Sequence, residues 1–197
     1  MNLKKFSEYI ASFDSPVILL EGSRTVEKDH LKQITRLAEK LAHTFPNATF
    51  RLGNAEGSDN LFAEGISKVN PAQLEMILPN DRKLKSTQKE RRISFDSLPD
   101  DEIKDICKIT KEATPANRAL IEYYEKGLQG VPQIKAKYLL RDALKVVGSK
   151  QLELKPANFA LFYLNSTKKT GGGTGHTIRV CKSQNVPFQK QEDWLEW

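Results

Sequence analysis

The sequence predicts an α/β fold with a mostly parallel sheet, and two observations support this expectation. Short apolar runs alternate with segments that have helical spacing, in the order strand, helix, strand, helix, strand over the first 78 residues. Three of the predicted strands are also followed by turns that contain glycine. Alternation with short connections is typical of parallel sheets with right-handed crossovers.

The first half of the chain supplies five of the expected elements. Residues 16–21 (PVILLE) are rich in Val, Ile and Leu and end at a glycine, which is typical of a buried parallel strand. Residues 27–45 place apolar side chains at helical spacing until Pro46 ends the pattern. The expected strands here are 16–21, 48–52 and 73–78, and the expected helices are 27–45 and 60–69, the latter capped by Ser58 or Asp59.

The middle of the chain, at about 80–155, breaks this alternation. It opens with a basic run at 82–92 (RKLKSTQKERR), which is either a solvated loop or a phosphate-contacting segment. Residues 98–102 (LPDDE) have the proline and acids of a helix start, and two amphipathic helices are expected at 116–126 and 135–147. We interpret this region as a helical insertion on the sheet, although it could instead contain an edge strand.

The alternation resumes near the C-terminus. Residues 158–164 (NFALFYL) predict the strongest strand of the chain, and a helix at 177–185 and a strand at 186–189 follow. Trp194 and Trp197 in the last four residues are expected to pack against the body or a second subunit. Together these patterns predict one Rossmann-like, three-layer domain over residues 1–197 with a helical insertion.

Composition and charge limit the classes of function. The chain has 197 residues and a net charge of +6, which favours polyanionic partners only modestly. Cys107 and Cys181 lie far apart without metal-ligand spacing, so we expect reduced thiols and no metal site. The longest apolar run near the N-terminus is too short for a signal-peptide core or a membrane span, and we expect a cytoplasmic protein that does not contact membranes.

The glycine-containing turns carry the predicted chemistry. The carboxyl ends of parallel strands lie along one edge of a sheet, so the turns should gather there. Glycine lets a phosphate approach the backbone closely, and the helix that follows offers free N–H groups to an anion. The first turn, Gly22-Ser23-Arg24, adds a hydroxyl donor and a guanidinium suited to bidentate phosphate binding.

The other two turns have different chemistry. The second contains Gly53, Asn54, Glu56, Gly57, Ser58 and Asp59, and its carboxylates suit sugar, base or catalysis better than phosphate. The third begins at Gly171 and has four glycines in five residues, so we expect it to be the phosphate cradle. Its candidate ligand-binding residues are Gly172, Gly173, Thr174, Gly175, His176 and Thr177.

Several nucleotide and hydrolase motifs are missing from the sequence. It contains no G-x-x-x-x-G-K-[ST] segment, so an ATP motor is not expected, and no G-x-G-x-x-G follows the first strand. It also lacks H-E-x-x-H and any cluster of Cys and His. The expected ligand is therefore a nucleotide held by turns of a different kind, with no further cofactor required.

These turns resemble those of the SLOG superfamily, the Rossmann-like group that contains the DNA-processing protein Smf/DprA and the LOG (lysine-decarboxylase-like) proteins. Gly22-Ser23-Arg24 is similar to the family's G-S-R. The pattern G-x-A-x-G-x-D with a later glycine is matched by Gly53, Ala55, Gly57, Asp59 and Gly65, and G-G-x-G by the run at 172–175. The resemblance covers about 16–78 and 158–190, and it implies a nucleotide or nucleic-acid phosphate site and a homodimer.

The resemblance leaves three functions open. LOG hydrolases carry P-G-G-x-G-T-x-x-E, and this chain has Arg179 at the place of the glutamate, which favours a nucleotide-binding or sensor module over an enzyme. The first alternative is a nucleotide N-glycosidase or phosphoribohydrolase with Glu56, Asp59 or His176 as its acid or base. The second is single-stranded DNA binding through Arg24 and the run at 82–92. Glu56 argues against this function, because a basic residue is common at that position in the Smf branch.

Overall fold

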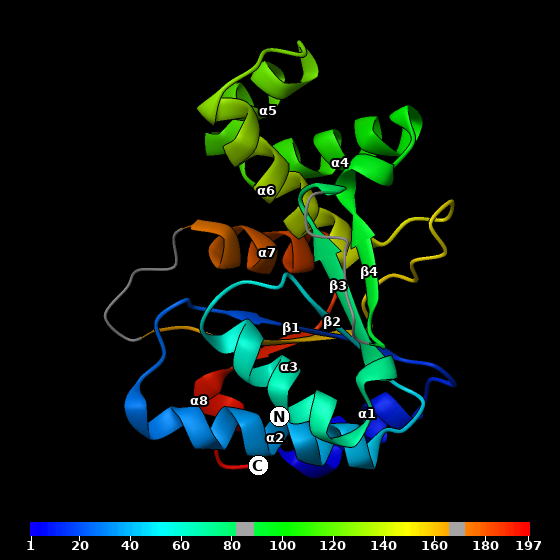
Figure 1. Cartoon of the computed structure of the whole chain (residues 1–197), viewed down its shortest axis with the longest axis vertical. Coiled ribbons are helices and arrows are strands. Elements are labelled where there is room, and N and C mark those ends of the chain that lie inside the picture. The colour runs from blue at the N-terminus through cyan, green and yellow to red at the C-terminus, as the bar shows by residue number, and fades with distance from the viewer. Residues whose placement is uncertain (82–88, 166–171) are drawn as a thin grey trace.

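The computed structural model describes residues 1–81, 89–165 and 172–197, and it has the expected α/β fold with a parallel sheet (Figure 1). The sheet has six parallel strands in the order β4-β3-β2-β1-β5-β6. The strands are β1 (Val17–Gly22), β2 (Thr49–Leu52), β3 (Leu74–Leu78), β4 (Arg91–Ser94), β5 (Phe159–Tyr163) and β6 (Phe188–Lys190).

Helices cover both faces of the sheet and complete three layers (Figure 1). One face packs against α1 (Leu3–Ala11), α2 (Leu31–Thr44), α3 (Ser58–Val69) and α8 (Gln191–Trp194). The other packs against α6 (Val131–Val147) and α7 (Gly172–Ser183), and α4 (Asp100–Ala113) and α5 (Arg118–Glu125) pack on these helices in turn. Single 3₁₀ turns lie at Lys28–His30, Pro71–Gln73, Phe95–Ser97 and Pro115–Asn117.

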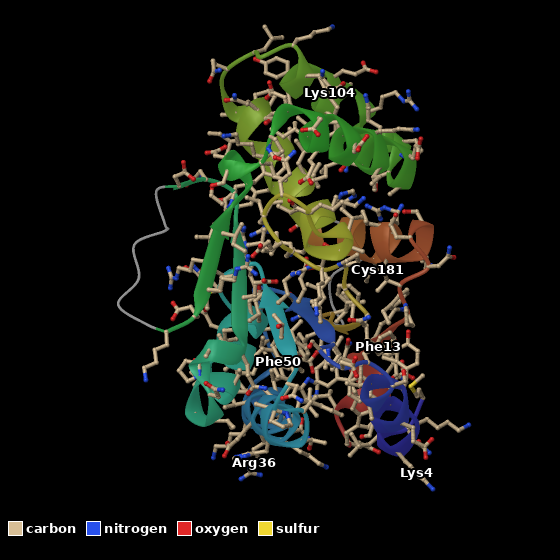
Figure 2. The ribbon with its side chains drawn as sticks, turned by 90° about the vertical axis from the view of Figure 1, so that its right-hand side faces the viewer. Lys4, Phe13, Arg36, Phe50, Lys104 and Cys181 are labelled. Carbon is tan, nitrogen blue, oxygen red and sulfur yellow. The ribbon has the colours of Figure 1, made fainter. Side chains whose placement is uncertain are left out.

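The alternation of side chains along the strands explains why the sheet has two cores. In β1, Ile18 and Leu20 face the layer of α1, α2 and α3, whereas Val17 and Leu19 face the layer of α6 and α7. Phe50 on β2 and Cys181 on α7 are both fully buried, in the first and the second core respectively (Figure 2). A sheet buried on both faces calls for mainly apolar strands, and the buried charged residues Glu21, Arg51 and Glu75 all have ion-pair partners.

The middle of the chain contains three helices and an edge strand. β4 pairs with β3 at the edge of the sheet, so the edge strand that the sequence left open is present. Residues 82–88 of the basic run lie outside the described residues. The two arginines at its end belong to β4, where Arg91 pairs with Glu75 at 3.1 Å and Arg92 with Glu90 at 2.8 Å.

The helix after β5 begins earlier than its sequence pattern predicts. α7 starts at Gly172 and not at 177, because its glycines form the first helical turn rather than a loop before it. Tertiary packing overrides the low helix propensity of glycine here. A Cβ on Gly173 would stand 2.7 Å from Oδ2 of Asp142, so only a bare backbone fits against α6 at this point.

The C-terminal tail packs against the body of the domain, as expected. Trp194 is fully buried, with ring centroids 5.8 Å from Phe62 and 6.4 Å from Tyr163. Trp197 lies 4.8 Å from the Phe6 ring. None of the helices in the described ranges is long and apolar enough to cross a membrane.

Gly65 allows α2 and α3 to pack closely and provides a test of this fold. A Cβ at Gly65 would stand 2.3 Å from the carbonyl oxygen of Thr35 and 2.7 Å from the Cβ of Ala38. Gly65→Ala gains about 1 kcal/mol in helix propensity, but the clash with backbone outweighs it. We expect a net loss of about 1–3 kcal/mol in the free energy of unfolding, measured by urea denaturation.

Ser67→Ala, on an exposed position of the same helix, is the matched control and should change stability by about 0.5 kcal/mol or less. A Gly65→Ala protein as stable as the wild type, or more so, would show that the two helices can separate without cost.

Candidate functional site

A pocket lies at the point where the strand order of the sheet reverses. Strands β1 to β4 follow one another toward one edge of the sheet, and the chain then returns so that β5 pairs with the other side of β1. In open α/β sheets ligands bind at the carboxyl ends of the strands at such a switch point. The pocket between β1 and β5 has a volume of about 470 Å³, within the range of small-molecule sites. Its lining includes Gly22, Ser23, Arg24 and Asp59, and also Gly172, Gly173 and Thr174, all from the predicted turns.

The floor of this pocket is a buried ionic cluster that joins β1 to α6. Lys145 Nζ lies 2.6 Å from Glu21 Oε2 and 2.9 Å from Asp142 Oδ1. Arg141 donates to Asp142 Oδ1 from Nε at 3.1 Å and from Nη2 at 2.7 Å, and its Nη1 donates to the carbonyl oxygen of Gly53 at 2.7 Å. Thr177 donates its hydroxyl to Glu21 Oε1 at 3.0 Å. Every one of these charged groups therefore has a partner, as burial requires.

The three carboxylates near Lys145 and Arg141 have different pKa shifts. Burial raises the pKa of Glu21 to about 7, because Lys145 opposes this effect only in part and the charges of Asp142 and Asp59 add to it. Burial also raises the pKa of Asp59. For Asp142 burial acts in the same direction, but Arg141 and Lys145 outweigh it and the pKa is lowered. Asp142 is thus the firmly ionised member of the cluster, and Glu21 titrates near neutral pH.

Asp59 positions the turns and does not cap a helix. Its carboxylate accepts hydrogen bonds from the backbone N–H groups of Gly22, Gly53 and Ala55, at 3.2–3.3 Å. α3 begins after Gly57, which has a φ of 83° and no side-chain cap, so the expected cap by Ser58 or Asp59 is wrong. The carboxylate satisfies N–H groups of the β1 and β2 turns instead, and thereby holds two strand ends together.

The glycines of the first two turns are needed for the packing of the chain itself. A Cβ on Gly22 would stand 2.3 Å from the carbonyl oxygen of Tyr163 and 2.7 Å from Ser58 Oγ. A Cβ on Gly57 would stand 2.4 Å from the carbonyl oxygen of Arg24. The close approach that the sequence pattern assigns to a phosphate is therefore, at these two glycines, an approach of one turn to another.

The rim of the pocket is made by the turn after β1 and by the start of α7. Arg24 is exposed and Ser23 half-buried, and Thr174 donates its hydroxyl to the carbonyl oxygen of Gly22 at 3.2 Å. Among the described residues, no atom lies within 4 Å of the place of a Cβ on Gly172, so none of them covers this end of α7. Free N–H groups at a helix start and an exposed guanidinium can bind an anion.

Other residues that the sequence singled out lie away from this pocket. His176 is fully buried, hydrogen-bonded to Thr114 Oγ1 at 2.8 Å, and burial lowers its pKa to about 4. It is therefore not placed to act as an acid or base on a ligand, because its ring is buried against Thr114 at the end of α4. Arg179 donates from Nε to the same Thr114 hydroxyl at 2.9 Å. Gly175 is buried within α7, Thr177 binds Glu21 as above, and Gly171 lies outside the described residues.

Two further hollows adjoin the pocket, and all three share Arg24 and Tyr138. One, of about 230 Å³, contains Gly53, Asn54 and Glu56. The other, of about 350 Å³, contains Asn117, Lys135 and Arg179. We call the three hollows together the switch-point groove. Arg141 Cζ lies 5.4 Å from the centroid of the Tyr138 ring, and this ring is 37% exposed.

The sequence reasoning missed the contribution of α6. Tyr138, Arg141, Asp142 and Lys145 have the spacing i, i+3, i+4, i+7, which places them on one face of a helix. A polar stripe of this kind, beside the apolar residues Leu139, Leu140, Ala143 and Leu144 of the same helix, was the available signal. Glu21, at the end of an otherwise apolar strand, was the second. No group of three or more His, Cys, Asp or Glu side chains in the described residues is arranged to hold a metal ion.

Comparison with known proteins yields a likeness of structure and none of sequence. No protein-family model matches the chain, and no curated protein matches it. A solved structure of DNA processing protein A from Helicobacter pylori, described for its single-stranded DNA binding mode, matches with a TM-score of 0.51. The two chains are 14% identical, and the match covers 96% of this chain and 68% of the other. At this identity the match shows a shared fold.

The raised pKa of Glu21 makes a prediction about stability and pH. In the unfolded chain Glu21 ionises near the ordinary value of 4.5, whereas in the folded protein it does so near 7. Stability from the protonated group is complete below pH 4.5 and is lost as the pH rises through 7. The free energy of unfolding of Glu21→Gln, relative to wild type, should thus rise by about 3 kcal/mol between pH 4.5 and 8.

Urea denaturation across this pH range measures the difference. Ser67→Ala, on an exposed position of α3, is the control, because it leaves Glu21 and its partners in place and should show the same fall with pH as the wild type. Parallel curves for the wild type and Glu21→Gln would contradict the assignment.

Proposed function

We propose that this chain binds single-stranded nucleic acid along the switch-point groove, with one nucleotide unit seated in the pocket between β1 and β5. The observation that carries the proposal is that Arg24 and Tyr138 line all three adjoining hollows. A cation and an exposed aromatic ring are thus common to a depression that is made of three adjoining hollows. Such a shape suits a flexible strand that extends beyond one nucleotide.

The charges around the groove suit a phosphate backbone. Arg24 and Lys135 are exposed and Arg179 is half-buried, and they come from three separate segments of the chain. Cations along a groove track the backbone of single-stranded nucleic acids and release bound counterions. The binding should therefore weaken steeply with salt.

Tyr138 supplies what the basic run at 82–92 lacks, an aromatic face among cations. Its ring contacts the Arg141 guanidinium, which is itself held by Asp142 and the Gly53 carbonyl oxygen. A base that stacks on an aromatic side chain gains about 1–3 kcal/mol whatever its identity. The Tyr138 ring thus contacts a guanidinium that is held in place, and part of the ring stays exposed to a ligand.

The structural likeness supports the same proposal. The protein from Helicobacter pylori that shares this fold is described as binding single-stranded DNA. The likeness extends over nearly the whole of this chain, and the groove proposed here lies at the strand ends where ligands of such folds bind.

Removal of the Arg24 charge tests the proposal directly. We expect Arg24→Ala to weaken binding of a fluorescein-labelled oligo-dT at least fivefold at 50 mM salt and to reduce the salt slope by about 1, because one phosphate contact is lost. Fluorescence anisotropy measures both quantities.

Arg36 is the matched control, since it points outward from α2 on the opposite layer (Figure 2). Arg36→Ala should bind as the wild type does. Absence of binding by the wild type at 50 mM salt, or equal losses in the two variants, would overturn the proposal.

Tyr138 provides a second test that separates stacking from charge. Tyr138→Ala should weaken oligo-dT binding by about tenfold without changing the salt slope, whereas Tyr138→Phe should retain nearly full affinity because the ring remains. The same anisotropy titrations serve. A loss in Tyr138→Phe equal to that in Tyr138→Ala would show that the ring is not a stacking surface.

A free nucleotide is the second candidate ligand. It is favoured by the volume of the pocket, about 470 Å³, and by the start of α7 beside Ser23 and Arg24, where one phosphate group can bind. Isothermal titration calorimetry with nucleoside monophosphates and ADP-ribose decides between the candidates. Binding of a mononucleotide more tightly than of a 12-nucleotide strand would favour the free nucleotide.

A further inference from the structure

Within the described part of the chain, the Asp142 carboxylate accepts hydrogen bonds through only one of its two oxygens. Its Oδ1 accepts three hydrogen bonds, two from Arg141 and one from Lys145. Among the described residues, none donates a hydrogen bond to its Oδ2. The residue is 1% exposed and lines the pocket, so this oxygen is a buried acceptor left for a ligand.

The start of α7 leaves room for that ligand. Gly173 lies directly against Asp142 Oδ2, since a Cβ at Gly173 would stand 2.7 Å from it. A side chain there would cover the oxygen. The bare backbone of the first helical turn allows a small group to reach the floor between α6 and α7.

The charges of the floor indicate what kind of group this is. Burial opposes ionisation of Asp142, but Arg141 and Lys145 outweigh it and hold the pKa below its usual value, so Oδ2 can only accept. The floor holds three carboxylates, of Glu21, Asp59 and Asp142, and two cations, of Arg141 and Lys145. The two cations are thus matched by carboxylates and offer a phosphate little net attraction, whereas Asp142 Oδ2 attracts an N–H or O–H donor.

We propose that Asp142 Oδ2 accepts a hydrogen bond from a neutral donor of the bound nucleotide, an exocyclic amine of the base or a hydroxyl of the sugar. The phosphate then stays at the rim, with Ser23, Arg24 and the start of α7. This inference rests on the proposed function and assigns the orientation of the nucleotide in the pocket. It gives Asp142 the role of a specificity-determining residue.

The test compares oligonucleotides that differ in one donor. Oligo-deoxyadenosine and oligo-deoxynebularine differ only in the 6-amino group, and oligo-uridine and oligo-deoxyuridine only in the 2′-hydroxyl. We expect the wild type to bind the donor-bearing strand of one pair about tenfold more tightly, which is the usual worth of a hydrogen bond to a charged group. The pair that shows the difference identifies the source of the donor.

Asp142→Asn should abolish or reverse this preference. Arg141 and Lys145 require an acceptor, so they will retain the amide oxygen of the asparagine and turn its NH₂ group toward the pocket. The floor then presents a donor where it presented an acceptor. Asp29→Asn, on an exposed position of the segment before α2, is the control and should keep the preference of the wild type.

The outcomes separate this inference from the proposed function. If no strand binds at 50 mM salt, the proposed function fails. If all four strands bind and neither pair differs, the proposed function stands and the assignment of Asp142 is wrong. A folded Asp142→Asn protein that keeps the preference also overturns the assignment, and if this variant does not fold, the wild-type comparison of the two pairs decides.

Discussion

The position of α6 on the sheet depends on Lys145, a buried cation that lies between two buried carboxylates. Its ammonium group bridges Glu21 at the end of β1 and Asp142 one turn earlier on α6. The carbonyl oxygen of Lys145 in turn accepts a hydrogen bond at 2.8 Å from Arg51, a fully buried side chain of β2 that also pairs with Glu75 on β3. Three neighbouring strands are thus tied to one helix by polar contacts inside a core that is otherwise apolar. Removal of one partner leaves an uncompensated buried charge, which costs about 3–5 kcal/mol.

This attachment decides where the chemistry of α6 lies. With Lys145 fixed under the switch point, the preceding turns of the helix bring Arg141 to the Gly53 carbonyl oxygen and Tyr138 to the mouth of the pocket. The glycines of the β1 and β2 turns act in the same direction, because they let the turns, α3 and β5 approach one another. The site is therefore made by two independent systems, close backbone contacts on one side and a charged helix face on the other.

The resulting site has a polarity that suits a nucleotide. Its rim presents Arg24, Ser23 and the open start of α7, which favour a phosphate. Its floor presents carboxylates that favour donors of the base or sugar, and Tyr138 beside it offers a face for stacking. In the proposed binding mode, the donors of the rim and the acceptors of the floor give the nucleotide one orientation. His176 is buried against Thr114 and Glu56 lies in the neighbouring hollow, so neither is among the described residues that line the pocket between β1 and β5.

The sequence alone determined five of the six strands, the mostly parallel sheet and the gathering of two turns at one edge, and it left the edge strand β4 open. Most of the buried strands are short apolar runs that can be recognised from adjacent residues of the sequence. Because β1 and β5 are parallel, their carboxyl ends bring Gly22-Ser23-Arg24 and the start of α7 together. The tertiary structure decided what those turns face. Glu21 and Lys145 are separated by 124 positions, and Asp142 and Gly173 lie on two different helices with β5 between them, so no local pattern relates them. It also decided that the glycine run is helical and His176 enclosed, because packing against α6 outweighs the weak local preferences of glycine. Local patterns fix which residues are buried, whereas the pairing of buried charges depends on which elements meet.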